Sequence, residues 1–172
     1  MNTKKLIITG KNNVEKINDF HDEKIKLNAL ENEIEHETAL SLLLDLDEGK
    51  LFNKEDILYK RVRREINDKI NSYKQQDIKK NIHNKDTLIT FNNIKNKLLN
   101  NLLHCSYCKK KVKILYRIVR DNYQWTLDRI DNNKNHTDDN TVISCLKCNL
   151  KKRCLDKKIF EFSQNLNIVK LS

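Results

Sequence analysis

The sequence predicts an α+β protein, in which a mainly helical N-terminal region precedes a small zinc-stapled module of strands and a helix. In the first half of the chain, apolar residues recur at three- and four-residue steps, which is typical of helices packed on one face. After Cys108 they alternate with polar residues, which is the period of a strand. Two Cys-x-x-Cys pairs flank the alternating segment, at Cys105, Cys108, Cys145 and Cys148. Four thiolates are the ligand set of a closed tetrahedral zinc site.

We therefore divide the chain into a helical accessory region, residues 1–86, and a zinc-bound domain, residues 87–172. Hydrophobic residues make up 38% of the chain and charged residues 34%, so the apolar core is expected to be modest. A structural metal stabilises small domains of this kind.

The charge of the chain is uneven. Residues 1–50 hold 7 Lys and no Arg against 11 acidic residues, whereas residues 51–172 hold 27 basic against 13 acidic residues. A basic C-terminal part predicts a polyanionic partner, DNA or alternatively RNA. The alternative explanation is a charged surface that only keeps the protein in solution.

Several classes of protein are excluded by composition. The chain has two Gly, at positions 10 and 49, and no Pro, which excludes a glycine-rich phosphate loop and the dinucleotide fold. No apolar run reaches about 18 residues, so we expect no membrane partner, and the apolar start is too short for a secretory signal. Cysteine pairs of this spacing favour metal thiolates in a reducing compartment, so we expect an intracellular protein of the cytoplasm or nucleus.

Two helices are expected in the accessory region. The first covers residues 14–46 and is closed by Gly49. The second begins at Asn53, a good N-cap residue, and residues 74–86 form a linker or a weak helix tail. Its apolar stripe is Leu58, Val62, Ile66, Ile70 and Tyr73. Its opposite face is basic, with Lys60, Arg61, Arg63, Arg64 and Lys74, and either contacts a polyanion or is simply solvated.

A third helix is expected from Thr90, its cap, through Leu103, where it delivers the chain to the first cysteine pair. The elements expected after this pair are a strand over 112–118, a tight turn at 121–122, a return strand over 123–130, a polar loop over 131–139, a short strand at 142–143 and a helix from Cys148 through Phe162. Trp125 is expected to anchor the core, and Cys154 is expected to be a packed free thiol outside the zinc site. A redox dithiol is the alternative to zinc for the cysteine pairs.

Three ordered motifs carry a family resemblance. They are Leu127-Asp128-Arg129-Ile130-Asp131-Asn132, then Asp139-Asn140-Thr141-Val142-Ile143, then Cys145-Leu146-Lys147-Cys148-Asn149 with Lys152. Together with the two cysteine pairs they resemble the HNH, or ββα-metal, endonuclease module, in the branch common in phages and large DNA viruses. The resemblance covers residues 88–160 and does not extend to the N-terminal half.

The resemblance implies roles for particular residues. Asp128 and Asn149 fall where the family places the ligands of a catalytic divalent ion, expected to be Mg²⁺, and Asn140 falls where the family has a residue that orients the loop. One carboxylate and one amide oxygen leave such an ion several positions for water and phosphate oxygens. The zinc would then be structural.

One position departs from the family pattern. The general base is usually a His directly after the metal-binding Asp, and here that residue is Arg129. A guanidinium does not accept a proton near neutral pH, but its fork suits a phosphate. Another group must then activate water: His136 in the loop, Asp131, or water on the metal without a protein base. The alternative for His136 is an ordinary loop residue.

Two basic clusters flank the cysteine pairs. They are Lys109, Lys110 and Lys111, and Lys151, Lys152 and Arg153. If the pairs share one ion, the clusters converge into a rim that contacts phosphates. The leading hypothesis is a metal-dependent endonuclease acting on DNA. The rivals are a catalytically degenerate zinc module that only binds nucleic acid, and an adaptor that binds proteins through its helices.

Overall fold

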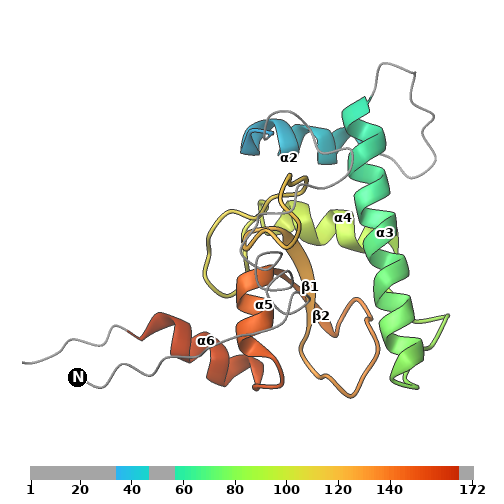
Figure 1. Cartoon of the computed structure of the whole chain (residues 1–172), viewed down its shortest axis with the longest axis vertical. Helices are drawn as coiled ribbons and strands as arrows, with labels where there is room; N and C mark the ends of the chain where they lie inside the picture. The colour runs from blue at the N-terminus through green and yellow to red at the C-terminus, as the bar shows by residue number, and fades with distance from the viewer. Residues whose placement is uncertain (1–33, 47–56, 167–172) are drawn as a thin grey trace, which may run out of the picture.

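The computed structural model describes residues 34–46 and 57–166, and within them it confirms the α+β fold class. The elements in chain order are α2 (His36–Asp45), α3 (Ile57–Lys79), α4 (Phe91–Asn100), β1 (Trp125–Arg129), β2 (Thr141–Cys145), α5 (Leu146–Lys152) and α6 (Lys157–Asn165). Figure 1 shows α3 as a long helix along one side, with α2 and α4 packed against it. The strands β1 and β2 form an antiparallel sheet that contacts α5.

Helix α3 follows the predicted apolar stripe and extends beyond it. Val62, Ile66 and Tyr73 are buried on the stripe. The helix continues through Lys79, so the helix tail, one of the two alternatives for residues 74–86, is confirmed for the first part of that segment. Asp77 lies in this last part of α3, one turn after Tyr73, and is fully buried. The expected helix over 14–33, Gly49 and Asn53 lie outside the described residues.

Helix α4 begins as predicted and ends earlier than predicted. The Thr90 hydroxyl accepts a hydrogen bond from Asn93 N (3.2 Å), and the Asn93 side chain accepts one from Thr90 N (3.1 Å). The helix ends at Asn100 because Leu102 and Leu103 adopt positive φ angles of 47° and 52°. Their backbone amides donate hydrogen bonds to carbonyls of the last helical turn. A helix end of this kind usually has glycine at the position with positive φ. Burial of the Leu103 side chain offsets part of the steric cost.

The predicted hairpin over 112–130 is wrong. The first half of that segment forms a single isolated bridge, between Lys113 and Gln124, and the strand partner of β1 is β2. Val112 and Ile114 are nevertheless buried. The alternating apolar residues therefore reach the core although their backbone is not hydrogen-bonded in a sheet. In β1 all five residues are buried, and Trp125 is completely buried, as expected of a core anchor.

The predicted single helix at the C-terminal end is two helices. Helix α5 stops at Arg153, whose φ of 50° breaks the helical path. Asp156 then caps α6 by accepting hydrogen bonds from Lys158 N (2.8 Å) and Ile159 N (3.2 Å). Cys154 lies in this break and is exposed, so the prediction that it is packed is wrong.

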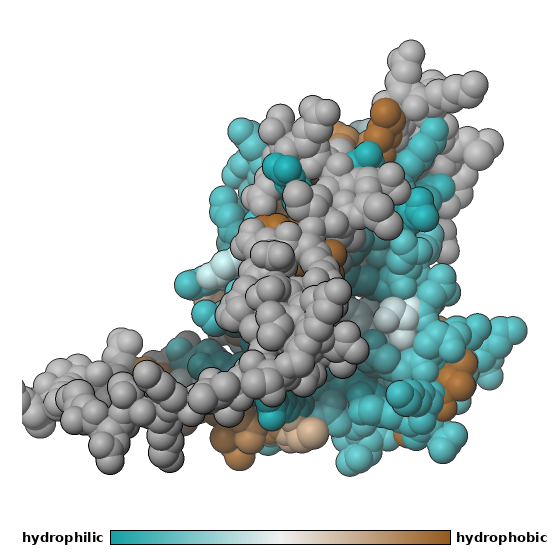
Figure 2. All heavy atoms as spheres, in the orientation of Figure 1, coloured by the Kyte–Doolittle hydropathy of each residue, from teal (hydrophilic) through white to brown (hydrophobic). Residues whose placement is uncertain are grey.

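The described surface is mainly polar. Figure 2 shows small hydrophobic areas separated by hydrophilic side chains where the described residues are visible. No described helix has the length and apolar character to cross a membrane.

Candidate functional site

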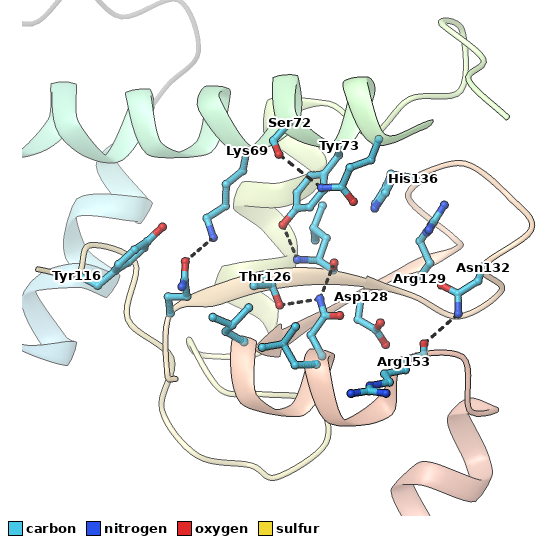
Figure 3. A pocket seen from close by; sticks show the side chains of 16 residues that line it. Lys69, Ser72, Tyr73, Tyr116, Thr126, Asp128, Arg129, Asn132, His136 and Arg153 are labelled. Atoms are coloured by element: carbon cyan, nitrogen blue, oxygen red, sulfur yellow. Dashed lines mark hydrogen bonds between the residues drawn. The ribbon is translucent and has the colours of Figure 1, made fainter. Parts of the chain in front are cut away.

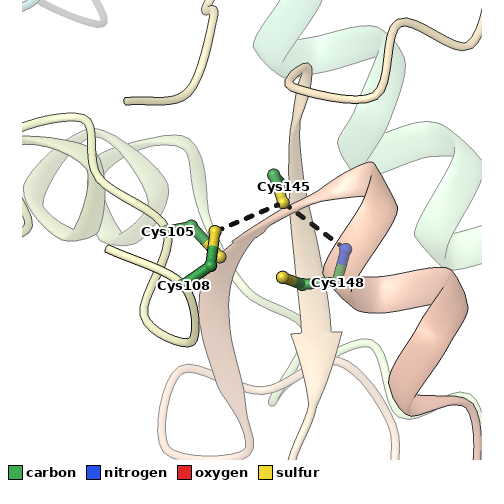
Figure 4. A group of neighbouring side chains, drawn as sticks. All are labelled: Cys105, Cys108, Cys145 and Cys148. Atoms are coloured by element: carbon green, nitrogen blue, oxygen red, sulfur yellow. Dashed lines mark hydrogen bonds between the residues drawn. The ribbon is translucent and has the colours of Figure 1, made fainter. Parts of the chain in front are cut away.

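The four predicted cysteines converge. Their sulfur atoms all lie within 4.8 Å of one another, although the two pairs are far apart in the sequence. The sulfurs of Cys108 and Cys145 are 3.9 Å apart. Zinc–sulfur bonds of about 2.3 Å in a tetrahedron place sulfurs about 3.8 Å apart, so the cluster has the dimensions to bind a metal such as zinc. Figure 4 shows one pair on a loop and the other at the junction of a strand and a helix.

Local backbone geometry holds each pair. Cys145 ends β2 and caps α5, and its sulfur accepts a hydrogen bond from Cys148 N at 3.4 Å. In the first pair, Lys109 adopts a φ of 58° and its amide donates to Cys105 O at 3.0 Å. The turn that follows each first cysteine therefore brings the second sulfur back toward it.

The thiols of the cluster affect one another. Burial, together with the neighbouring Cys105, raises the pKa of Cys148 to about 12. A hydrogen bond from Cys145 lowers the pKa of Cys105 to about 4. Each thiolate therefore opposes the ionisation of its neighbours. A divalent cation supplies the positive charge that lets all four ionise together.

A polar cavity of about 410 Å³ lies along the edge of β1 that does not pair with β2. Figure 3 shows α3 on one side of β1 and α5 on the other. The cavity brings together four of the five residues predicted for catalysis, Asp128, Arg129, His136 and Asn149. Lys69 and Arg153 border it as well, which makes it rich in cations. Asn140 is not among the lining residues.

Asp128 is buried in the sheet beside α5. Its Oδ2 lies 3.1 Å from Lys152 Nζ and accepts a hydrogen bond from the Tyr107 hydroxyl. Burial raises the pKa of Asp128, although both partners oppose the shift. Within the described residues, both polar contacts of this carboxylate use Oδ2, so Oδ1 is the oxygen left for a ligand.

Asn149 extends from α5 to the same strand. Its Nδ2 donates to Thr126 Oγ1 (3.1 Å) and to Leu127 O (3.2 Å). Thr126 and Asp128 are two residues apart and so share one face of β1. Because the amino group of Asn149 is engaged, its Oδ1 is the end available to a cation.

Mg²⁺ in proteins often has only one or two protein ligands and otherwise keeps water and phosphate oxygens, so a site of that kind would need no more than the two oxygens of Asp128 and Asn149. They do not form a protein cage. Within the described residues, the four cysteines are the only cluster of three or more cysteine, histidine or acidic ligands.

Arg129 points toward α3. Its side chain is buried, with NH1 3.4 Å from Asp77 Oδ1 and 3.2 Å from Lys134 O. These contacts differ from the phosphate clamp expected from its guanidinium. The structure instead gives Arg129 a carboxylate partner within the protein.

His136 is buried and contacts α3 through both ring and backbone. Its Nδ1 lies 2.7 Å from Asp77 Oδ1, and its amide donates to Asp77 Oδ2 at 2.8 Å. The ring stacks on Tyr73 with the centroids 4.6 Å apart. Burial lowers the pKa of His136, and the Asp77 charge opposes this shift.

Sequence reasoning missed Asp77. Its spacing held the signal, because it continues the stripe of Val62, Ile66 and Tyr73 at a four-residue step. A carboxylate on a buried stripe requires partners, and those partners mark a polar site.

Asn140 crosslinks the loop between the strands. Its Nδ2 donates to Asp131 O and Asn135 O, each at 3.0 Å, and its Oδ1 accepts from Asp131 N at 2.9 Å. These three bonds tie the two parts of the loop together. They also hold the segment that carries His136.

The two basic clusters differ. Lys109, Lys110, Lys111, Lys151 and Arg153 are exposed. The prediction that Lys152 joins the rim is wrong, because its side chain is completely buried and its ammonium is bound to Asp128 and to Arg129 O (2.9 Å). A buried ammonium requires such partners, so this lysine is unavailable to phosphate.

The free edge of β1 is covered by side chains. The four that bond its backbone are Lys69 at Trp125 O, Tyr73 at Leu127 N, Asn149 at Leu127 O and Lys152 at Arg129 O. Two come from α3 and two from α5. This arrangement satisfies the polar groups of the edge and fastens both helices to the strand that carries Asp128.

Comparisons with protein-family models, with curated proteins and with solved structures find no match for this chain. What the structure itself shows is a four-cysteine cluster suited to a metal, joined to a strand–strand–helix unit.

Proposed function

We propose that the chain is a metal-dependent endonuclease that hydrolyses DNA phosphodiester bonds, with RNA as an alternative substrate. The observation that carries the proposal is the cavity along the free edge of β1. It combines two oxygen ligands, Asp128 and Asn149, with a histidine, His136, and an exposed cation, Arg153. A divalent ion, a base and a cation near phosphate are the groups that this hydrolysis requires.

Each residue has a part in the proposed reaction. Asp128 Oδ1 and Asn149 Oδ1 would hold Mg²⁺, which supplies positive charge to the scissile phosphate when bound. Lys152 orients Asp128 through Oδ2. Arg153 and the exposed lysines beside the cysteine pairs bind flanking phosphates.

The test is nicking of supercoiled plasmid in Mg²⁺ or Mn²⁺. Asp128→Asn preserves the shape of the side chain but leaves the buried Lys152 without its carboxylate, so it is assayed as protein that still binds zinc and DNA, in which the nicking rate should fall at least about 100-fold. Asp139→Asn is the matched control, because that carboxylate is exposed on the adjoining loop. Equal rates for wild type and Asp128→Asn, or no nicking by wild type in either ion, overturn the proposal.

One observation favours a second function, a degenerate module that binds nucleic acid without cutting it. Lys152 already neutralises Asp128, and Arg129 stands where the family has its base. This module would bind DNA with an affinity that falls steeply with salt, and would never nick it. If neither DNA nor RNA binds at low salt, the adaptor hypothesis remains.

A further inference from the structure

A buried carboxylate from α3 and an imidazole from the loop between the strands meet at the cavity. Asp77 is fully buried, and its two oxygens receive the Nδ1 and the backbone amide of His136. We propose that Asp77 is a positioning residue that keeps the proton of His136 on Nδ1, so that Nε2 acts as the general base. Helix α3 is then part of the active site. This inference rests on the proposed nuclease function.

The tautomer follows from hydrogen-bond chemistry. An ionised carboxylate only accepts hydrogen bonds, so an Nδ1 atom 2.7 Å from Asp77 Oδ1 must carry the proton. In neutral imidazole the other nitrogen is then the acceptor. Because Asp77 Oδ2 also receives the amide of the same residue at 2.8 Å, it fixes both the backbone and the ring of His136.

Tyr73 fixes the plane of the ring. It lies one turn before Asp77 on α3 and stacks on His136 with an interplanar angle of 25°. Its hydroxyl accepts a hydrogen bond from Leu127 N at 2.9 Å. Among the described residues, the hydrogen bond of the His136 ring uses Nδ1 and not Nε2, and His136 borders the cavity that also contains Asp128.

Arg129 also contacts Asp77. Its NH1 lies 3.4 Å from the same Asp77 oxygen that holds the imidazole. The residue that replaces the family's base therefore supports the carboxylate that holds a different base. The charged groups that act on His136 are Asp77, Arg129 and Lys80.

In the proposed step, His136 Nε2 removes a proton from water while the water oxygen bonds to phosphorus. The bond between phosphorus and the leaving sugar oxygen breaks, and that oxygen takes a proton from solvent. The imidazolium then releases its proton to solvent. Because burial lowers the pKa of His136, the imidazole is neutral and able to accept at pH 7.

The first test needs no variant. Proton–nitrogen correlation spectra of the zinc-loaded full chain, labelled at histidine nitrogens, should show His136 as the Nδ1–H tautomer. The Nε2–H tautomer overturns the inference. In Asp77→Asn, the amino group of the new side chain would face either the backbone amide or the Nδ1–H group of His136, and it cannot accept a hydrogen bond from either. The variant should therefore shift His136 toward the Nε2–H tautomer.

The second test is kinetic. Asp77→Asn should lower nicking at least about 100-fold while DNA affinity and zinc content hold. The pH at which the nicking rate increases should be lower in this variant than in wild type, because the carboxylate that favours the charged imidazole is gone. If Asp77 had only a structural role, the rate would increase at the same pH in both proteins. Asp68→Asn, an exposed carboxylate on α3, is the matched control and should nick at the wild-type rate.

Two outcomes separate this inference from the proposed function. A wild type that never nicks DNA overturns the nuclease and with it the role of His136 as base. A nicking wild type whose Asp77→Asn variant keeps full rate overturns only the role of Asp77. If that variant does not fold, His136→Ala is assayed with added imidazole: rescue of nicking supports the base, and a wild-type rate without imidazole overturns it.

Discussion

Lys152 Nζ lies 3.1 Å from Asp128 Oδ2 and 2.9 Å from Arg129 O, with its side chain completely buried. Its neighbours Lys151 and Arg153 are exposed. One residue in a run of three cations therefore holds α5 to β1, while the other two face solvent. Lys152 therefore contributes to stability, whereas Lys151 and Arg153 contribute positive charge to the surface.

Lys152→Met should destabilise the fold by about 3–5 kcal/mol, because it leaves the Asp128 carboxylate buried without its cation. The free energy of unfolding of the zinc-loaded chain in urea measures this loss. Lys151→Met, the matched control, should change it by less than about 0.5 kcal/mol.

The same pair of variants should behave in the opposite way toward DNA. The slope of the logarithm of the DNA-binding constant against the logarithm of the salt concentration should become shallower by about one when the exposed Lys151 is lost. Loss of Lys152 should leave this slope unchanged in the folded protein. Equal slopes for Lys151→Met and wild type would remove this part of the surface from the DNA interface.

Purified protein should contain one zinc per chain, bound by four sulfurs. Cys148→Ser should lose the metal and unfold the module around it, because the free energy of zinc binding is part of the free energy of folding. Metal analysis and circular dichroism measure both effects. Cys154→Ser should keep the zinc, since that thiol is exposed and outside the cluster. Full folding with a strong chelator present would contradict a structural metal.

Tyr73→Phe should destabilise the fold by about 1–3 kcal/mol, because the buried amide of Leu127 loses its acceptor. Hydrogen exchange at the Leu127 amide should accelerate, which locates the effect on the free edge of β1. Tyr59→Phe removes a hydroxyl whose bond to Asp45 is exposed, and should cost less. Unchanged exchange at Leu127 would mean that the edge is held by other contacts.

The burial of His136 predicts a dependence of stability on pH. Its pKa in the folded chain is lowered, so the unfolded chain binds the proton more readily below about pH 6.5. The stability that neutral His136 provides is therefore present above that pH and is lost as the pH falls. The free energy of unfolding of wild type minus that of His136→Gln should shrink from pH 7 to pH 5. A difference that grows over this range would contradict a lowered pKa.

Local features of the fold were readable from the sequence. The Thr90 cap, the stripe of α3 and the burial of Trp125 follow from hydrogen-bonding groups and apolar spacing within a few residues. The early end of α4 at Asn100 was not readable, because leucine rarely adopts positive φ angles. The alternation over 112–118 misled, since burial on alternate residues does not require a strand partner.

The candidate site was readable only in part. Asp128, Asn149 and His136 were expected at the site, and they border one cavity. Asp77 was missed, because it lies 59 residues before His136 and only the packing of α3 brings the two together.

By itself, the sequence determined which side chains can bind a metal and which segments can be helical, because ligand chemistry and helical period are properties of nearby residues. Only the tertiary structure decided that β2 is the partner of β1, that Lys152 is buried and that Asp77 holds His136. Those outcomes depend on which distant surfaces exclude water together. A buried charge then acquires its role from the partner that packing places beside it.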